Sequence, residues 1–310
     1  MSERVPAISS PGYGPVLLVL ISAMMWGLWW VPIRICEALG LTGVWPNFGI
    51  NLGALLGLLV VVLAGRAIPK LTGPALLGAT LIGMAVAFYG ASLSLTDVVR
   101  AVLLFYLAPA WSTLIEVIFL GRRWHWKRLP PLILSFAGMI VVFRGEIALD
   151  NGGIGDLIAL LSGMAWSIGA ALVFSTKPND VNHEQRSEVA SLSLAVMVSA
   201  VITSLVMLPL KWQGWPDPSG DAFALAVPLA LGTGVLYLAP IIGITLWGAR
   251  KLLPATISFL LAAEIISGVT SSAFFLDEPF GWWEAGGTIM IITSVIAHVA
   301  LDDSSRTQTA

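Results

Sequence analysis

Ten apolar segments, each about as long as a lipid bilayer is thick, follow one another along residues 15–301 of this chain. A transmembrane helix needs about 20 mostly apolar residues. Only 11% of the residues are charged, whereas a soluble domain carries about 25%. The sequence therefore predicts an all-α integral membrane protein in a lipid bilayer. We expect spans at 15–34, 45–64, 72–92, 97–119, 128–145, 153–175, 188–209, 222–246, 252–275 and 282–301.

Basic residues are divided unequally between the two ends of these segments. All but four of the 16 lysines and arginines lie on the side of the N-terminus, and the exceptions are Arg34, Arg100, Arg144 and Lys211. Lysine and arginine are in excess on the cytoplasmic side of membrane proteins. We therefore expect both termini, as tails 1–14 and 302–310, in the cytoplasm, and a multi-pass protein of the bacterial inner membrane.

The two halves of the chain, 15–146 and 152–301, resemble each other weakly. The first segment of each half centres on a tryptophan, Trp26 in AMMWGLWW and Trp166 in GMAWSIGA. The fourth segment of each half ends in a similar turn, LGRRWHW in the first and LDEPFGWW in the second. Five helices is an odd number, so the second half must lie inverted in the membrane. Inverted repeats are common in transporters and place the substrate near the midplane, where the repeats meet.

The chain resembles the EamA-type ten-helix carriers of the drug/metabolite transporter superfamily over about residues 15–300. Four short matches occur in the family's order, at Met25-Trp26-Gly27, Leu107-Ala108-Pro109, Leu120-Gly121-Arg122 and Leu276-Asp277-Glu278. Such families often have glutamate where this chain has Arg122. The resemblance implies a substrate cavity formed by helices one, three, four, six, eight and nine. It also implies alternating access by a rocking bundle, with amino acids or related small metabolites as cargo.

One carboxylate, Glu264, lies at the middle of the apolar stretch Leu252–Glu278. A charge at the bilayer centre costs several kcal/mol, so such a residue usually faces a cavity or a partner. On a helix, Ser267 and Ser271 share its face and form a small polar track. We expect Glu264, Ser267 and Ser271 to bind substrate and Glu264 to couple transport to protons. The alternative is a structural acid hydrogen-bonded to a neighbouring helix.

Aromatic residues near the centres of the expected spans are further candidates for the substrate site. Trp26 and Trp166 lie too deep for the interfacial belt, and Trp30 lies one turn beyond Trp26. Aromatic walls can hold organic cations through cation–π contacts. The same side chains could instead pack helices together. Tyr89, Tyr106 and Tyr237 belong to the corresponding spans three, four and eight, and we expect their hydroxyls in the same cavity.

Several other residues have simpler interpretations. Glu116 favours pairing with nearby arginines at the cytoplasmic interface. Gly49, Gly53 and Gly57 repeat every four residues, a pattern typical of close helix packing. This pattern predicts contacts within the bundle or at the seam of a possible homodimer.

The sequence lacks the motifs that several classes of function require. Cys36 is the single cysteine, the histidines form no metal-binding spacing, and no nucleotide-binding loop occurs. We therefore expect no cofactor or metal, no nucleic-acid partner, and transport driven by a gradient or by exchange. A secondary carrier of a small neutral, zwitterionic or cationic solute, acting in export, agrees best with these features. An importer or exchanger of organic cations such as quaternary amines is the alternative. A membrane-embedded enzyme acting on lipid and a channel are less consistent with the sequence, and we expect no enzymatic activity.

Overall fold

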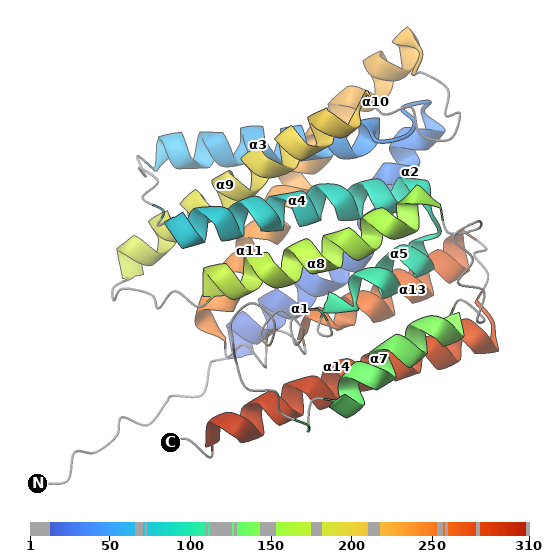
Figure 1. Ribbon diagram of the computed structural model, residues 1–310. Helices are drawn as coiled ribbons and strands as arrows, with labels where there is room; N and C mark the ends of the chain where they lie inside the picture. The colour runs from blue at the N-terminus through green and yellow to red at the C-terminus, as the bar shows by residue number, and fades with distance from the viewer. Residues whose placement is uncertain are drawn as a thin grey trace, which may run out of the picture.

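The computed structural model describes residues 13–65, 73–108, 129–142, 153–174, 182–209, 218–252, 260–276 and 280–307, with positions 71, 111, 126 and 257. All regular secondary structure in this described part is helical (Figure 1). Glu116 and the Leu120–Arg122 turn, like Pro109, Asp277 and Glu278, lie outside the described residues.

The helices have the following bounds. They are α1 (Tyr13–Gly27), α2 (Trp30–Ala38), α3 (Trp45–Ala64), α4 (Gly73–Leu95), α5 (Val98–Phe105), α7 (Leu129–Val142), α8 (Ile154–Phe174), α9 (Asn182–Met207), α10 (Gly220–Thr233), the π-helix η2 (Gly234–Leu238), α11 (Ala239–Lys251), α13 (Ala263–Phe275) and α14 (Trp282–Thr307).

Six helical segments are long and apolar enough to cross a membrane. They are Tyr13–Ala38, Trp45–Ala64, Gly73–Leu95, Ile154–Val173, Glu188–Met207 and Gly220–Lys251. The other four expected spans coincide with the places of α5, α7, α13 and α14. Six segments are therefore candidates for membrane crossing by their length and composition, and the total of ten crossings stays a prediction.

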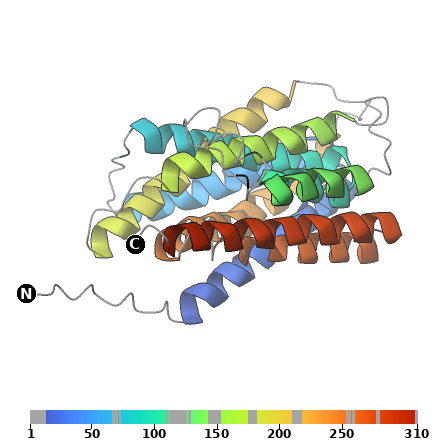
Figure 2. The ribbon, with the colours of Figure 1, turned by 60° about the horizontal axis from the view of Figure 1, so that its bottom comes forward.

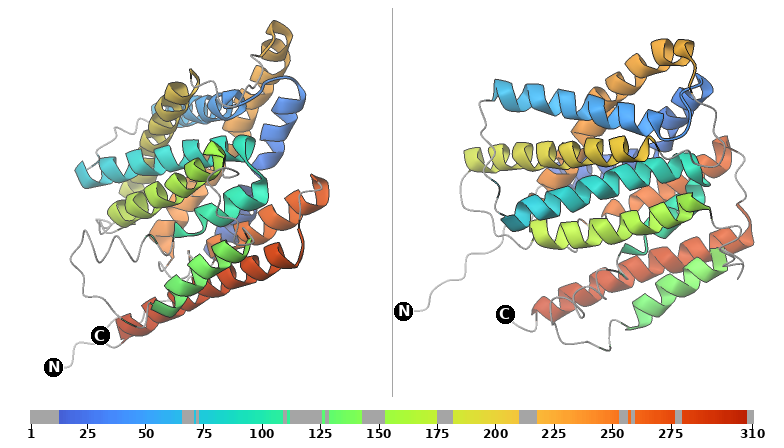
Figure 3. Two further views of the ribbon diagram at one scale, coloured as in Figure 1. Left: turned by 45° about the vertical axis from the view of Figure 1, so that its right-hand side comes forward. Right: turned by 45° about the horizontal axis from the view of Figure 1, so that its top comes forward.

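The longer helices lie side by side in the bundle. α3, α9, α4 and α8 follow one another across the bundle, and each packs against the next (Figure 3). α7 and α14 form a separate pair along one edge (Figure 1). α1 packs on α13 and α11, much as α8 packs on α5 and α4. The division of the chain into two related halves stays a prediction.

The described chain begins and finishes at the same end of the bundle. The first turn of α1 and the last turn of α14 both lie towards the left in Figures 1 and 2. An even number of crossings requires this arrangement. The side of the membrane on which this end lies stays a prediction from the basic residues.

The first expected span is not one continuous helix. α1 ends at Gly27, and α2 begins at Trp30 after a short turn. In this turn, backbone N–H groups bond to carbonyls three residues earlier instead of four. Leu28 N–H bonds to Met25 O and Val31 N–H bonds to Leu28 O, both at 3.0 Å. Pro32 explains the interruption, because proline has no N–H to donate to the carbonyl four residues earlier and its ring clashes with it.

The eighth expected span contains a π-helical turn, η2. Its end is marked by a hydrogen bond from Ala239 N–H to Gly234 O, five residues earlier. Pro240 follows at once and provides no donor for the preceding turn, which favours the wider winding. Single π-turns inside α-helices are frequent at functional sites.

The glycine repeat of α3 packs inside the bundle. A β-carbon on Gly53 would lie 2.1 Å from Leu231 O, and one on Gly49 would lie 2.8 Å from the Ala230 side chain. α3 and the α10–η2 segment therefore approach with their backbones almost in contact. Of the two interpretations, packing within the chain accounts for this repeat.

Candidate functional site

Glu264 lies in the first turn of α13 and is 4% exposed. A turn at Ala262 directly precedes α13, and Ile265 N–H bonds to Ala262 O, three residues earlier. One carboxylate oxygen, Oε2, is 2.8 Å from the Tyr106 hydroxyl. The other oxygen, Oε1, is buried without a hydrogen-bond partner in the structure. A buried polar atom of this kind needs an explanation, such as an absent ligand or water.

Three tyrosines from three different elements converge on Glu264. Tyr106 follows the end of α5, Tyr89 belongs to α4, and Tyr237 belongs to η2. Tyr106 forms the hydrogen bond already described, the Tyr89 hydroxyl acts on the carboxyl group both through hydrogen bonding and electrostatically, and the Tyr237 hydroxyl acts on it electrostatically. The structure thus brings together all the tyrosines that the sequence analysis assigned to one cavity.

The tyrosine hydroxyls also bond to backbone carbonyls at irregular turns. The Tyr237 hydroxyl donates to Met25 O at 2.5 Å, beside the α1–α2 interruption. The Tyr106 hydroxyl is 2.5 Å from Leu261 O, beside the turn that precedes α13. Irregular backbone at membrane depth is tolerated where it is buried in protein or lines a cavity. Four interrupted helices therefore meet around Glu264, an arrangement typical of transporter binding sites.

Aromatic rings form a continuous row beside this group. Neighbouring ring centroids in the row lie 4.9–6.1 Å apart, within the range of favourable aromatic contacts. In order, the row is Trp26, Trp29, Tyr89, Phe105 and then both Tyr106 and Trp166. Trp26 and Trp166, the two central tryptophans of the two halves, are thus connected through three intervening rings.

Trp26 and Trp30 have different surroundings. The Trp26 indole N–H donates to Thr245 Oγ1 of α11 at 3.0 Å, and Ser22 lies 3.1 Å from the same oxygen. The Trp30 indole N–H donates to Ser271 Oγ at 3.0 Å. Both rings are buried. These bonds show that the two tryptophans tie α1 and α2 to neighbouring helices, and a role in lining a pocket stays a prediction.

Ser267 helps to hold α1 against α13. Its hydroxyl donates to Met24 O at 3.0 Å. Gly27 lies at the same crossing, where an added β-carbon would be 2.5 Å from Glu264 O. The close approach of the two backbones places the α1–α2 interruption directly beside Glu264.

Sequence analysis missed two members of the aromatic row, Trp29 and Phe105. Trp29 is fully buried, and its ring lies between those of Trp26 and Tyr89. Its position three residues after Trp26 was a usable signal, since residues with this spacing share a helix face. Phe105 and Thr245 carried no comparable signal, because their partners come from other helices.

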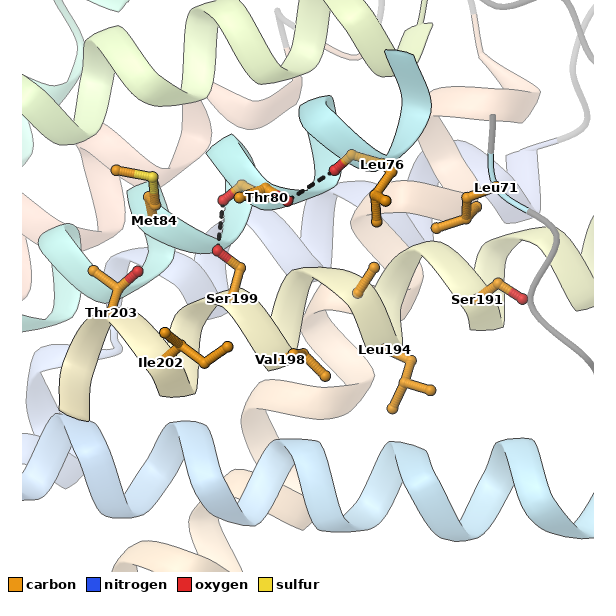
Figure 4. A pocket seen from close by; sticks show the side chains of 11 residues that line it. Leu71, Leu76, Thr80, Met84, Ser191, Leu194, Val198, Ser199, Ile202 and Thr203 are labelled. Atoms are coloured by element: carbon orange, nitrogen blue, oxygen red, sulfur yellow. Dashed lines mark hydrogen bonds between the residues drawn. The ribbon is translucent and has the colours of Figure 1, made fainter. Parts of the chain in front are cut away.

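A separate groove of about 590 Å³ lies between α4 and α9 (Figure 4). Its lining is mostly apolar, and Leu76, Val198 and Ile202 are exposed there. Two of its hydroxyls are bonded to backbone carbonyls, Ser199 to Thr80 O at 2.7 Å and Thr80 to Leu76 O at 2.9 Å. The groove contains none of the expected site residues and no charged group, so the Glu264 cluster is the better candidate site for a polar solute. Among the described residues, no group of three His, Cys, Asp or Glu side chains could hold a metal ion.

Comparison with known families finds a match in the first half of the chain. Residues 14–144 match the model of the EamA-like transporter family. These residues are therefore similar to the EamA-like transporter family. The resemblance to EamA-type carriers is thereby confirmed for this part of the chain, and the chain is a multi-pass protein of the cell membrane.

Several individual proteins that are similar to this chain are named as transporters. The protein named "Uncharacterized transporter YvbV" of Bacillus subtilis (strain 168) is 24% identical over 291 residues, which cover 90% of this chain and 89% of that protein. Two S-adenosylmethionine uptake transporters, from Rickettsia felis and Rickettsia prowazekii, are each 26% identical. Those two alignments cover 49% and 50% of this chain and only 46% and 48% of the relatives.

One solved crystal structure has a similar fold over almost its whole length. It covers 92% of this chain and 96% of its own, with a TM-score of 0.54 and 19% sequence identity. The likeness therefore extends beyond residues 14–144 into the second half of the chain.

Proposed function

We propose that this protein is a secondary carrier that moves a small zwitterionic or cationic solute, an amino acid or a related amine, across the cell membrane by alternating access. Glu264 is the binding group for the positively charged end of the solute. Export is the direction that we expect. Neutral relatives of such solutes would use the tyrosine and serine hydroxyls of the same site.

The unpartnered Oε1 atom of Glu264 is the observation that carries this proposal. A buried acceptor without a partner costs about 1–3 kcal/mol, and more if it is charged. An ammonium group would both satisfy this atom and neutralise the carboxylate. The described residues around it supply hydroxyl groups and rings but no lysine or arginine, which argues against an anionic solute.

Import or exchange of an organic cation is the second candidate. The row of aromatic rings from Trp26 to Trp166 favours it, because ring faces attract organic cations. Two relatives are named for S-adenosylmethionine, a sulfonium cation that also carries an amino-acid group. Such a solute would place its positive charge near Glu264 and its flat ring system against the aromatic row.

Transport by purified protein in liposomes tests the role of Glu264. Solutes are first selected by the thermal stabilisation that binding produces, from amino acids, amines and sulfonium compounds. Glu264→Gln should reduce uptake of the selected solute at least about tenfold, the factor that corresponds to about 1.4 kcal/mol. The reason is that the amide cannot neutralise a cation.

Glu284→Gln is the matched control. Glu284 is also a buried glutamate, and it accepts a hydrogen bond from Gly281 N–H at the start of α14, which a glutamine can also accept. This variant should transport at nearly the wild-type rate. Full transport by Glu264→Gln, with normal folding, would refute the proposed binding role.

A further inference from the structure

The Tyr106 hydroxyl lies between two acceptors but has a single hydrogen to donate. Leu261 O is 2.5 Å from Tyr106 Oη, and Glu264 Oε2 is 2.8 Å from it. Two oxygens only 2.5 Å apart repel each other unless a hydrogen lies between them, and a backbone carbonyl has none to give. The Tyr106 hydrogen is therefore directed to Leu261 O.

This assignment implies that Glu264 is protonated in this conformation. If Tyr106 donates to Leu261 O, the hydrogen between Tyr106 Oη and Glu264 Oε2 must come from the carboxyl group. A protonated carboxyl group also agrees with the unpartnered Oε1, because a neutral acceptor costs less to bury than a charged one. The two oxygens then have different tasks: Oε2 contacts Tyr106, and Oε1 remains for a solute.

We propose that Tyr106 is a proton-dependent latch that fastens the turn before α13 to the end of α5. While Glu264 is protonated, Tyr106 donates to Leu261 O and holds this turn. When Glu264 gives its proton to water, in exchange for a solute cation at Oε1, Oε2 becomes the stronger acceptor. The Tyr106 hydrogen then turns to Oε2, and Leu261 O loses its partner. The turn before α13 is thereby released. The exchange of the Glu264 proton for a solute cation rests on the proposed function.

Among the residues that the structure describes, few other groups that could titrate lie near this latch. α1 and α5 are the elements that pack most closely on α13. α1 contains Tyr13, which is 94% exposed at its far end, and α5 contains Arg100, which is paired with Asp156 at 2.6 Å. Tyr89 of α4 and Tyr237 of η2 also interact with Glu264. The Tyr237 hydrogen is already donated to Met25 O.

Hydrogen–deuterium exchange of the full-length protein without solute tests the latch directly. Exchange in the peptides that span residues 260–269 is compared between about pH 5 and pH 9, after correction for intrinsic amide exchange. Wild-type exchange should become faster at high pH by up to about tenfold, as expected for the loss of one hydrogen bond.

Two variants define the closed and open latch. Glu264→Gln should keep the peptides protected at every pH, because its side-chain amide donates to Tyr106 as the protonated carboxyl does. Tyr106→Phe should exchange fast at every pH. The matched control, Tyr237→Phe, removes the other tyrosine–carbonyl bond and should loosen the α1–α2 turn while keeping the pH response of residues 260–269.

The outcomes separate the latch from the proposed function. A wild-type protein without a pH response, or a Tyr106→Phe variant that keeps it, would overturn the latch. If either of these results were found while transport still depended on Glu264, the latch would be refuted and the proposed function would remain. Full transport by Glu264→Gln would refute the proposed function, whatever the exchange data showed.

Discussion

At the scale of single residues, the polar side chains of the bundle interior hold backbone turns together. Tyr237 and Ser267 bond to carbonyls of α1, and Ser167 bonds to Ala108 O at 2.8 Å. These carbonyls lie beside interrupted helices, where regular backbone bonds are missing. Polar groups in the membrane interior thus stabilise the irregular backbone that surrounds Glu264.

The hydrogen bond between Trp26 and Thr245 provides a residue-scale prediction. Trp26→Phe removes the N–H donor, and Thr245→Val removes the acceptor. Each single change should lower the free energy of unfolding, and the double change should cost less than their sum. We expect a coupling of about 0.5–1.5 kcal/mol, the usual net value of one hydrogen bond.

Unfolding in detergent, followed for the wild type and the three variants, measures this coupling. Trp30→Phe is a useful comparison with Thr245→Val, because Trp30 bonds to Ser271 instead. That pair should show strictly additive effects. An additive result for Trp26 and Thr245 would mean that the indole N–H contributes nothing to the packing of α1 on α11.

At the scale of helices, proline and glycine decide where the elements break and how closely they approach. Pro32 and Pro240 account for the α1–α2 turn and for η2, because each removes a backbone donor. Glycines at the crossings of α1 with α13 and of α3 with α10 let backbones touch. The irregular turns and the close crossings together bring four helices to Glu264.

Gly53→Ala should separate α3 from the α10–η2 segment. Its β-carbon would lie 2.1 Å from Leu231 O, a backbone atom that cannot turn away. We expect a loss of about 1–3 kcal/mol, as for other overpacked positions. Thermal unfolding measures this loss. Gly232→Ala in α10 is the control, because its β-carbon would meet nothing within 4 Å. Equal stability of the two variants would contradict the close crossing.

At the scale of the whole molecule, ion pairs gather near the ends of the bundle. Arg100 joins α5 to Asp156 at the start of α8, and Arg250 joins the end of α11 to Glu188 of α9 at 2.8 Å. Between these ends, the exposed side chains are rich in leucine, isoleucine and valine. This distribution suits a molecule whose middle lies in hydrocarbon and whose ends lie in water.

The orientation of the bundle gives a prediction at this scale. Because basic residues are concentrated at the end that carries both termini, this end should face the cytoplasm. A fluorescent protein fused after Ala310 should fold and fluoresce in cells, whereas alkaline phosphatase fused there should stay inactive. In the loop before α8, a fused fluorescent protein should stay dark and a fused alkaline phosphatase should be active. The reverse pattern would invert the proposed topology.

Hydropathy alone was sufficient to predict that the protein lies in a membrane. Segments that cross a lipid bilayer must be long and apolar, whichever helices they pack against. The sequence also indicated Glu264 and the three tyrosines, since polar groups in such segments stand out. It did not locate the interruptions around Glu264 in space, nor did it identify Trp29 or Phe105. Those features depend on contacts between residues far apart in the chain, such as Tyr106 with Leu261, and only the tertiary structure decides which helices meet.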